Sequence, residues 1–331
     1  MKPVHSGGSA ATARRAMLSI GLALGLIASG GHTIAAPSEV TIPGDHVFPE
    51  SITATSDGTL IIGSLGQGGI YRAAPGASTA ELWIKPGTAG TMSVLGVLAD
   101  ERSGTLWVCS SDLSGAGVTV PGGQRPVALK AFDLASGAPK GSVPLPGERT
   151  LCNDIAIGPD GAAYVTDSFN PHVLRLKPGA SAFEVFATDD RFTVKDGAGL
   201  DGIAFGSDGK LYVNLYNGNA LFRIDINGDG SAGKVTQLHP SQPIALCDGM
   251  RKLGTNTLLM VEGTGKLDRV TIDGDHARIA VLKSGYKTPV SVVRVGNTAW
   301  VLEGQLTALF GPNKGKPGPF RAYAVPLGEV D

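Results

Sequence analysis

The strongest constraint on the fold of this 331-residue chain is a polar residue that recurs seven positions before a tight turn. It precedes an Asp-Gly turn three times and the degenerate turn Thr-Asn once. The four polar residues are Glu50, Asn153, Asp201 and Asp248. In each stretch one apolar, β-prone run leads into the turn and a second run follows it, which predicts a β-hairpin.

Hairpins repeated at this spacing are typical of a propeller. Six units align on their turns, with ring positions about every 42 to 57 residues, at Gly96 in unit two and near Val290 in unit six. We therefore predict an all-β, six-bladed β-propeller whose four-stranded antiparallel blades surround a central channel. We expect flanking strands at residues 39–42 and 320–325 to share one blade and close the ring.

The first residues have the composition of a leader. Lys2, Arg14 and Arg15 precede an apolar stretch over 17–28 that is too short to span a bilayer, and small residues follow. We expect residues 1–36 to be a signal peptide and 37–331 to be the propeller domain. The mature protein is then periplasmic or secreted, and both the Sec and the twin-arginine route fit the leader.

Charge and composition limit the partners. Because the leader carries three basic residues, the mature chain is more acidic than the formal net charge of −1. No basic block occurs, so we expect neither a nucleic-acid nor a membrane partner. A small-molecule substrate and a monomer are expected instead.

Equivalent positions of successive blades converge on the axis of a propeller. Three carboxylates and one carboxamide would therefore meet at one channel mouth. Buried charges without cationic partners are destabilising, so we predict a metal ion held by Glu50, Asn153, Asp201 and Asp248. Oxygen ligands favour Ca²⁺, although another divalent cation stays open. The alternative interpretation, as strand-start caps or turn formers, accounts for one or two of the four.

The segments around these residues resemble the SMP-30/gluconolactonase/luciferin-regenerating-enzyme-like family of six-bladed propellers. The resemblance covers about residues 45–327 and rests on the segments 48–52, 152–156, 200–204 and 247–251. It implies that Glu50 and Asn153 match metal-site residues of that family and that Asp248 is both a ligand and the general base. Asp201 stands where the family usually has Asn, which adds a negative charge to the site.

The resemblance implies a calcium-dependent lactonase, and the leader implies that it is exported. The ion would polarise the carbonyl while Asp248 takes a proton from the attacking water, with Asp201 as the reserve base. The alternative is a non-catalytic ligand- or protein-binding propeller with a structural Ca²⁺. Second strands are expected to return to the ring face, so Asp167, Asn214 and Glu262 are predicted to bind substrate at the pocket rim.

Other motifs carry less weight. Cys152 and Cys247 directly precede ring residues in blades judged too far apart for a disulfide, so both are expected to be small buried hydrophobes. Residues 225–230 imitate the first half of an EF-hand loop, but Thr236 occupies position twelve, which favours a hairpin over a second calcium site. Residues 303–318 are expected to form a loop that partly covers the channel.

Overall fold

The computed structural model describes residues 7–8, 37–120, 125–310 and 314–328. The chain divides into two units, Met1–Ala35 and Ala36–Asp331. The signal peptide expected over residues 1–36 lies outside the described residues apart from Gly7 and Gly8, and it stays a prediction. Within the described ranges, no helix has the length and apolar character needed to cross a membrane.

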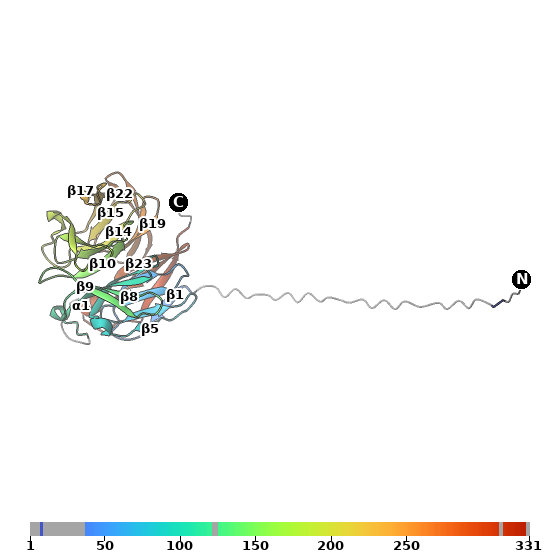
Figure 1. Cartoon of the computed structure of the whole chain (residues 1–331). Coiled ribbons are helices and arrows are strands. Elements are labelled where there is room, and N and C mark those ends of the chain that lie inside the picture. Colours follow the sequence, from blue (N-terminus) through green and yellow to red (C-terminus); the bar gives the residue numbers. More distant parts are fainter. Residues whose placement is uncertain (1–6, 9–36, 121–124, 311–313, 329–331) are drawn as a thin grey trace, which may run out of the picture. The chain divides into compact units, whose positions relative to one another are not determined.

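The second unit is a six-bladed β-propeller built on four-stranded antiparallel blades, which confirms the predicted fold (Figure 1). Blade one contains β2 (Pro49–Ala54), β3 (Leu60–Ser64), β4 (Ile70–Ala73) and β5 (Glu81–Ile84). Blade two contains β6 (Ser93–Asp100), β7 (Thr105–Ser111), β8 (Ala128–Asp133) and β9 (Pro139–Pro144). Blade three contains β10 (Cys152–Ile157), β11 (Ala163–Asp167), β12 (His172–Leu176) and β13 (Glu184–Thr188).

The remaining blades continue the pattern. Blade four contains β14 (Leu200–Phe205), β15 (Leu211–Leu215), β16 (Ala220–Ile226) and β17 (Ala232–Gln237). Blade five contains β19 (Cys247–Gly254), β20 (Thr257–Glu262), β21 (Lys266–Asp273) and β22 (His276–Ser284), with the short β18 (His239–Pro240) at its edge. Blade six contains β23 (Pro289–Val295), β24 (Thr298–Glu303), β25 (Phe320–Pro326) and β1 (Glu39–Ile42), and helix α1 (Thr307–Phe310) follows β24.

The ring is closed within blade six, as expected. Strand β1 pairs antiparallel with β25, in a register that runs from Glu39 opposite Tyr323 to Ile42 opposite Phe320. Side chains along β1 alternate between partly exposed and buried, which is the period of a strand with one face on the core. The Phe320 ring packs edge-on against that of Phe48, with centroids 5.1 Å apart, so the closing strand is fixed to blade one.

The Asp-Gly turns form the hairpins that the sequence predicts. Gly58, Gly161 and Gly209 have φ values of 92°, 80° and 74°, and Asn256 takes the same left-handed region at 53°. The Asp side chain of each turn accepts a hydrogen bond from the backbone N–H two residues later, in the pairs Asp57–Thr59, Asp160–Ala162 and Asp208–Lys210. These repeated hydrogen bonds fix the turns in which the first strands of the blades end.

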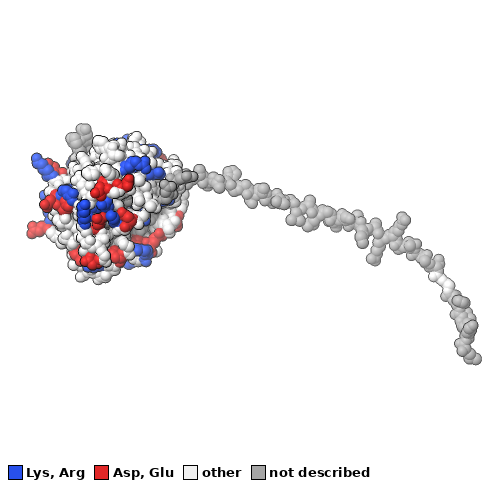
Figure 2. All heavy atoms as spheres, turned by 90° about the horizontal axis from the view of Figure 1, so that it is seen from above, with Lys and Arg blue, Asp and Glu red and all other residues white. Residues whose placement is uncertain are grey.

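The EF-hand-like segment 225–230 forms a hairpin between β16 and β17, as favoured from the sequence. Asp225 lies 3.1 Å from Lys210 and 3.2 Å from Arg223, so cationic side chains already neutralise it. Asp229 accepts a hydrogen bond from the Ser231 N–H. Basic and acidic groups are likewise interspersed on the face seen in Figure 2.

A disulfide joins two blades. Cys109 on β7 is bonded to Cys152 on β10, with a Cα–Cα distance of 5.1 Å, and Cys247 is a free, buried cysteine. The expectation that Cys152 is an unbonded buried hydrophobe is therefore wrong, while Cys247 fits it. The pairing was missed because Cys109 belongs to a second strand, and its approach to the next blade depends on packing between blades.

Removing this disulfide is expected to destabilise the propeller. The bond spans 43 residues, and the loop-closure model gives about 4 kcal/mol for a loop of that length. The variant Cys109→Ala/Cys152→Ala should therefore have a lower midpoint in urea than Cys247→Ala, which removes one buried sulfur without breaking a cross-link. Equal midpoints in the two variants, or an unchanged midpoint of the native protein in dithiothreitol, would contradict this expectation.

Candidate functional site

The first strands of the six blades form a closed ring around the channel. Each of β2, β6, β10, β14, β19 and β23 contacts the next, and β23 contacts β2. At the ends where these strands begin, a cavity of about 490 Å³ opens. All four predicted ring residues line it: Glu50, Asn153, Asp201 and Asp248. Their relative exposures are 7%, 4%, 5% and 4%, so four polar side chains are almost fully buried at one place.

Every first strand has a β-bulge or similar irregularity at its ring residue. The register shifts lie between Pro49 and Ser51, Val94 and Val97, Cys152 and Ile155, Leu200 and Ile203, Cys247 and Met250, and Pro289 and Ser291. A bulge leaves a residue outside the ladder and changes the direction of its side chain. The repeated irregularity explains how strands packed side by side can present ring side chains such as Glu50 and Asp248 to the cavity.

These registers correct one predicted ring position. In blade two the equivalent of Asn153 is Leu95, which lines the cavity, and not Gly96. Gly96 lies where β6 and β10 approach closely, since a Cβ atom there would be 2.3 Å from the Asn153 carbonyl oxygen. The ring therefore consists of Glu50, Leu95, Asn153, Asp201, Asp248 and Val290, polar in four blades and apolar in two.

Hydrogen bonds between blades hold the polar ring residues in place. The Asn153 Nδ2 donates to Asp201 Oδ2 at 3.0 Å and to Ser168 Oγ at 2.8 Å, so both bonds use the amide nitrogen and leave the amide oxygen for another partner. Thr166 Oγ1 donates to the backbone oxygen of Asp201 at 2.7 Å. Asn214 Nδ2 donates to the backbone oxygen of Asp248 at the same distance.

Burial raises the pKa values of the three ring carboxyl groups and disfavours the state in which all three are ionised. Burial, with Asp154 as the next cause, raises the pKa of Asp201 from 3.8 to about 7. Burial and the negative charge of Asp201 raise the pKa of Glu50 and of Asp248 well above their ordinary values. Two or three negative charges in one small cavity thus destabilise one another.

A buried ion pair lies directly beneath the ring. Asp154, next to Asn153 on β10, accepts from both terminal nitrogens of Arg251, at 2.6 and 2.9 Å. One carboxylate oxygen of Asp154 also accepts from the backbone N–H of Ile155 at 2.9 Å. Arg251 forms its ion pair with Asp154 and offsets only part of the charge at the ring: it lowers the pKa of Glu50, but burial, Asp201 and Asp154 raise that pKa by more. In the sequence, the only trace of this pair is an Arg two residues after the Asp248-Gly motif.

The donor set of the ring fits a hard cation. The available ligands are carboxylate and carboxamide oxygens, which suit Ca²⁺ more than a transition metal. In the part of the chain that the structure describes, no three His, Cys, Asp or Glu side chains stand ready to hold a metal ion. The carboxylates of Glu50, Asp201 and Asp248 would therefore have to draw together around an ion.

The three predicted substrate contacts lie elsewhere. Asp167, Asn214 and Glu262 are fully buried and none of them lines the cavity. Asp167 accepts from the Leu151 and Phe169 N–H groups, and Glu262 accepts from the Ala245 N–H and from Lys266. The second strands do return toward the ring face, but these side chains turn inward to satisfy backbone groups. Asn214 acts on the site indirectly, through the Asp248 carbonyl.

One lining residue, Tyr216, was not predicted from the sequence. Tyr216, just after β15, lines the cavity, and burial together with the charge of Asp248 raises the pKa of its hydroxyl. Leu306, Thr307 and Phe310 in and before α1 also line it, which agrees with the expectation that residues 303–318 partly cover the channel. No histidine is among the described residues of the lining.

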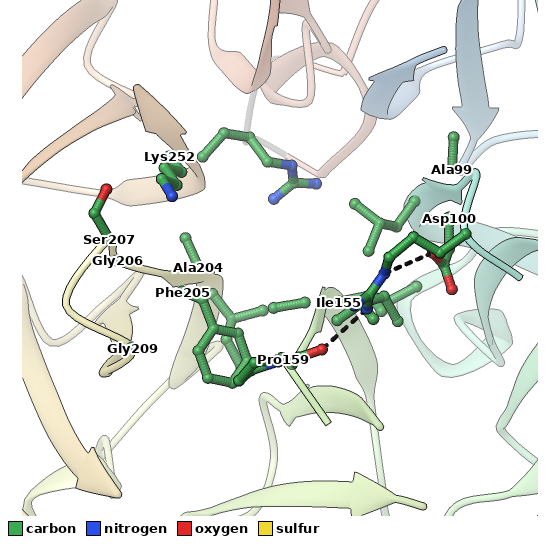
Figure 3. A pocket seen from close by; sticks show the side chains of 17 residues that line it. Ala99, Asp100, Ile155, Pro159, Ala204, Phe205, Gly206, Ser207, Gly209 and Lys252 are labelled. Carbon is green, nitrogen blue, oxygen red and sulfur yellow. Dashed lines mark hydrogen bonds and ion pairs between the residues drawn. The ribbon is translucent and has the colours of Figure 1, made fainter. Parts of the chain in front are cut away.

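A second cavity of about 530 Å³ lies at the opposite ends of the first strands (Figure 3). Ile155, Ala204 and Phe205 give it an apolar wall. Arg102 at its edge bonds the Gly158 carbonyl at 3.0 Å and lies 3.7 Å from Asp100. Its charged groups are thus largely paired, unlike the carboxylates of the ring, and we place the candidate site at the ring.

Solved structures share this fold at low sequence identity. No family model and no curated protein matches the chain. Luciferin-regenerating enzyme matches with a TM-score of 0.63 and 13% identity over 88% of this chain and 95% of that one. A gluconolactonase from Xanthomonas campestris matches with a TM-score of 0.60 and 18% identity over 87% and 89%. Virginiamycin B lyase from Staphylococcus aureus matches with a TM-score of 0.57 and 16% identity over 86% and 82%.

These likenesses agree with the family resemblance seen in the sequence, but at such identities they show the fold alone. The matched proteins include a lactonase and a lyase, so one architecture carries different reactions. The choice between reactions therefore depends on the residues of the cavity.

Proposed function

We propose that the chain is an exported, calcium-dependent hydrolase that opens lactones in the cavity at the ring. The observation that carries this proposal is the burial of Glu50, Asn153, Asp201 and Asp248 in one cavity. The apolar leader at residues 1–36 supports the export. Similarity of the fold to a gluconolactonase supports the reaction class.

The ring residues would divide into ligands and a base. Glu50, Asn153, Asp201 and Asp248 would hold the ion, which when bound supplies a Lewis acid for the substrate carbonyl. Asp248 accepts a hydrogen bond from the Gly249 N–H through Oδ1, which fixes the carboxylate, and as the base it would take a proton from water. Asp201, which Asn153 orients at 3.0 Å, is the second carboxylate able to serve as base.

The lining of the cavity favours water as the nucleophile. Its described residues include no Ser, Cys, Lys or His side chain, so no covalent intermediate with such a group is expected. Direct attack by water suits a strained ester such as a lactone more than an amide. The matched virginiamycin B lyase loses activity when one histidine is replaced by alanine, and no histidine is found among the described residues that line this cavity, which argues against that chemistry.

The proposal is tested with a panel of five- and six-membered lactones, aryl esters and peptides, followed by acid release in a pH-stat. We expect lactone hydrolysis that EDTA abolishes and added calcium restores, with no release from peptides. Heat-denatured protein with the same calcium gives the background rate. If no member of the panel is hydrolysed above that background, a ligand-binding propeller with a structural ion replaces the proposal.

A further inference from the structure

The wall between the ring and the cavity mouth is strongly apolar. Its apolar members come from five blades or the loops next to them, and they are Leu65, Leu113, Ala116, Leu151, Phe169, Ala198, Leu306 and Phe310. The charged groups of the lining are all at the ring, namely Glu50, Asp201 and Asp248. The cavity thus has a polar floor and an apolar wall.

The wall offers few partners to a hydroxylated ligand. Its polar side chains in the described residues are Tyr216, Asn217, Thr288 and Thr307. The Asn217 Oδ1 is already occupied by the Ala198 N–H at 2.8 Å. A sugar lactone carries several hydroxyl groups, and each one left without a partner on burial weakens binding.

Two aromatic side chains extend the apolar wall to the surface. Phe169 and Phe310 keep exposures of 38% and 40%, although most large hydrophobic side chains of the described residues are buried. The guanidinium of Arg149 lies 4.9 Å from the centre of the Phe169 ring and restrains it. Exposed apolar groups that continue the lining of a cavity are typical of a ligand-binding mouth.

We propose that the cavity takes lactones or related esters that carry an apolar substituent, with the carbonyl at the ring and the substituent along this wall. The inference rests on the proposed function for the reacting group. The apolar character of the substituent is inferred separately, from the contrast between the polar ring and the apolar wall. Sugar lactones are expected to be poor ligands, because their hydroxyl groups would face leucine and phenylalanine side chains.

The first arm of the test measures binding without turnover. A series of γ-lactams with alkyl chains of increasing length, which resist hydrolysis, is titrated calorimetrically into the full protein with calcium. Each added methylene should lower the dissociation constant roughly threefold to fourfold until the chain leaves the cavity. A polyhydroxylated lactam of equal size serves as the polar probe and should bind more weakly than every alkyl member.

The second arm uses variants. Phe169→Ser/Phe310→Ser should reduce the gain per methylene, whereas Leu82→Ser/Val185→Ser changes two exposed hydrophobic residues outside the cavity and should leave the gain unaltered. An affinity that does not depend on chain length, a preference for the polar probe, or equal effects of the two double variants would overturn the inference.

The two proposals fail in different ways. If alkyl lactams bind with the expected gain but no lactone is hydrolysed, the proposed reaction is wrong and the apolar ligand site stands. If lactones are hydrolysed with no preference for an alkyl substituent, the reaction stands and the substrate class is wrong.

Discussion

Calcium is expected to raise the melting temperature of the metal-free protein by several degrees near pH 7.5 and by much less near pH 5. Folding raises the pKa of Asp201 to about 7, and that of Glu50 and Asp248 in the same direction. Because these carboxyl groups hold a proton more tightly in the folded protein than in the unfolded one, protonation contributes to the free energy of unfolding. This contribution is fully present below the pKa of the unfolded state and is lost as the pH rises through the pKa of the folded state. A bound cation replaces it, and a ligand at 100 times its Kd contributes about 2.7 kcal/mol.

Melting curves in EDTA and in excess calcium, recorded across this pH range, check the expectation. Asp201→Asn removes one carboxylate, so it should stabilise the metal-free protein near pH 7.5 and reduce the gain from calcium. Burial and the neighbouring Glu262 raise the pKa of Asp268 to about 7, which adds a pH dependence that calcium should not alter. Curves that coincide with and without calcium at every pH would refute the ion site.

Asp248→Asn is expected to abolish most lactone turnover while the protein still folds and binds calcium. The change keeps the side-chain size and one ligand oxygen but removes the group that accepts a proton, and general-base catalysis typically contributes 10²- to 10⁴-fold. The loss should therefore appear in kcat more than in KM. Asp273→Asn alters an exposed aspartate on another face of blade five and is the matched control.

Glu50→Ala is expected to act differently, because it removes a ligand and leaves the base. Its activity should fall at low calcium and recover in part when calcium is raised. If Asp248→Asn keeps full turnover on a lactone that the native protein hydrolyses, Asp201 becomes the base to test next.

The fold and the four polar members of the ring could be predicted because both follow from local chemistry. An Asp-Gly turn constrains the backbone wherever it occurs, so counting back from each turn finds the ring residue of blades one, three and four. Blade two differs, since β6 pairs Asp100 with Thr105 where β10 pairs Ile157 with Ala163. That change in the hairpin shifted the predicted position from Leu95 to Gly96.

Other parts of the site depend on contacts between blades, which leave little trace in the sequence. Asp154 and Arg251 are 97 positions apart and meet because the first strands of blades three and five face one channel. Asn214, near the end of the second strand β15, is one of the residues that the sequence predicts to bind substrate. Its amide instead reaches the backbone of the next blade. Neither outcome could be inferred before the register between neighbouring blades was known.

The closure of blade six has a consequence for how the protein is made. Strand β1 is the first of the propeller to leave the ribosome, and its partner β25 is the last. The circle therefore cannot be completed while the polypeptide is still being synthesised, and until then the edges of β24 and of β1 stay open. Since pairing across the whole chain length is slow, newly made molecules stay incompletely folded for longest at this seam, and aggregation or chaperone contact should concentrate there.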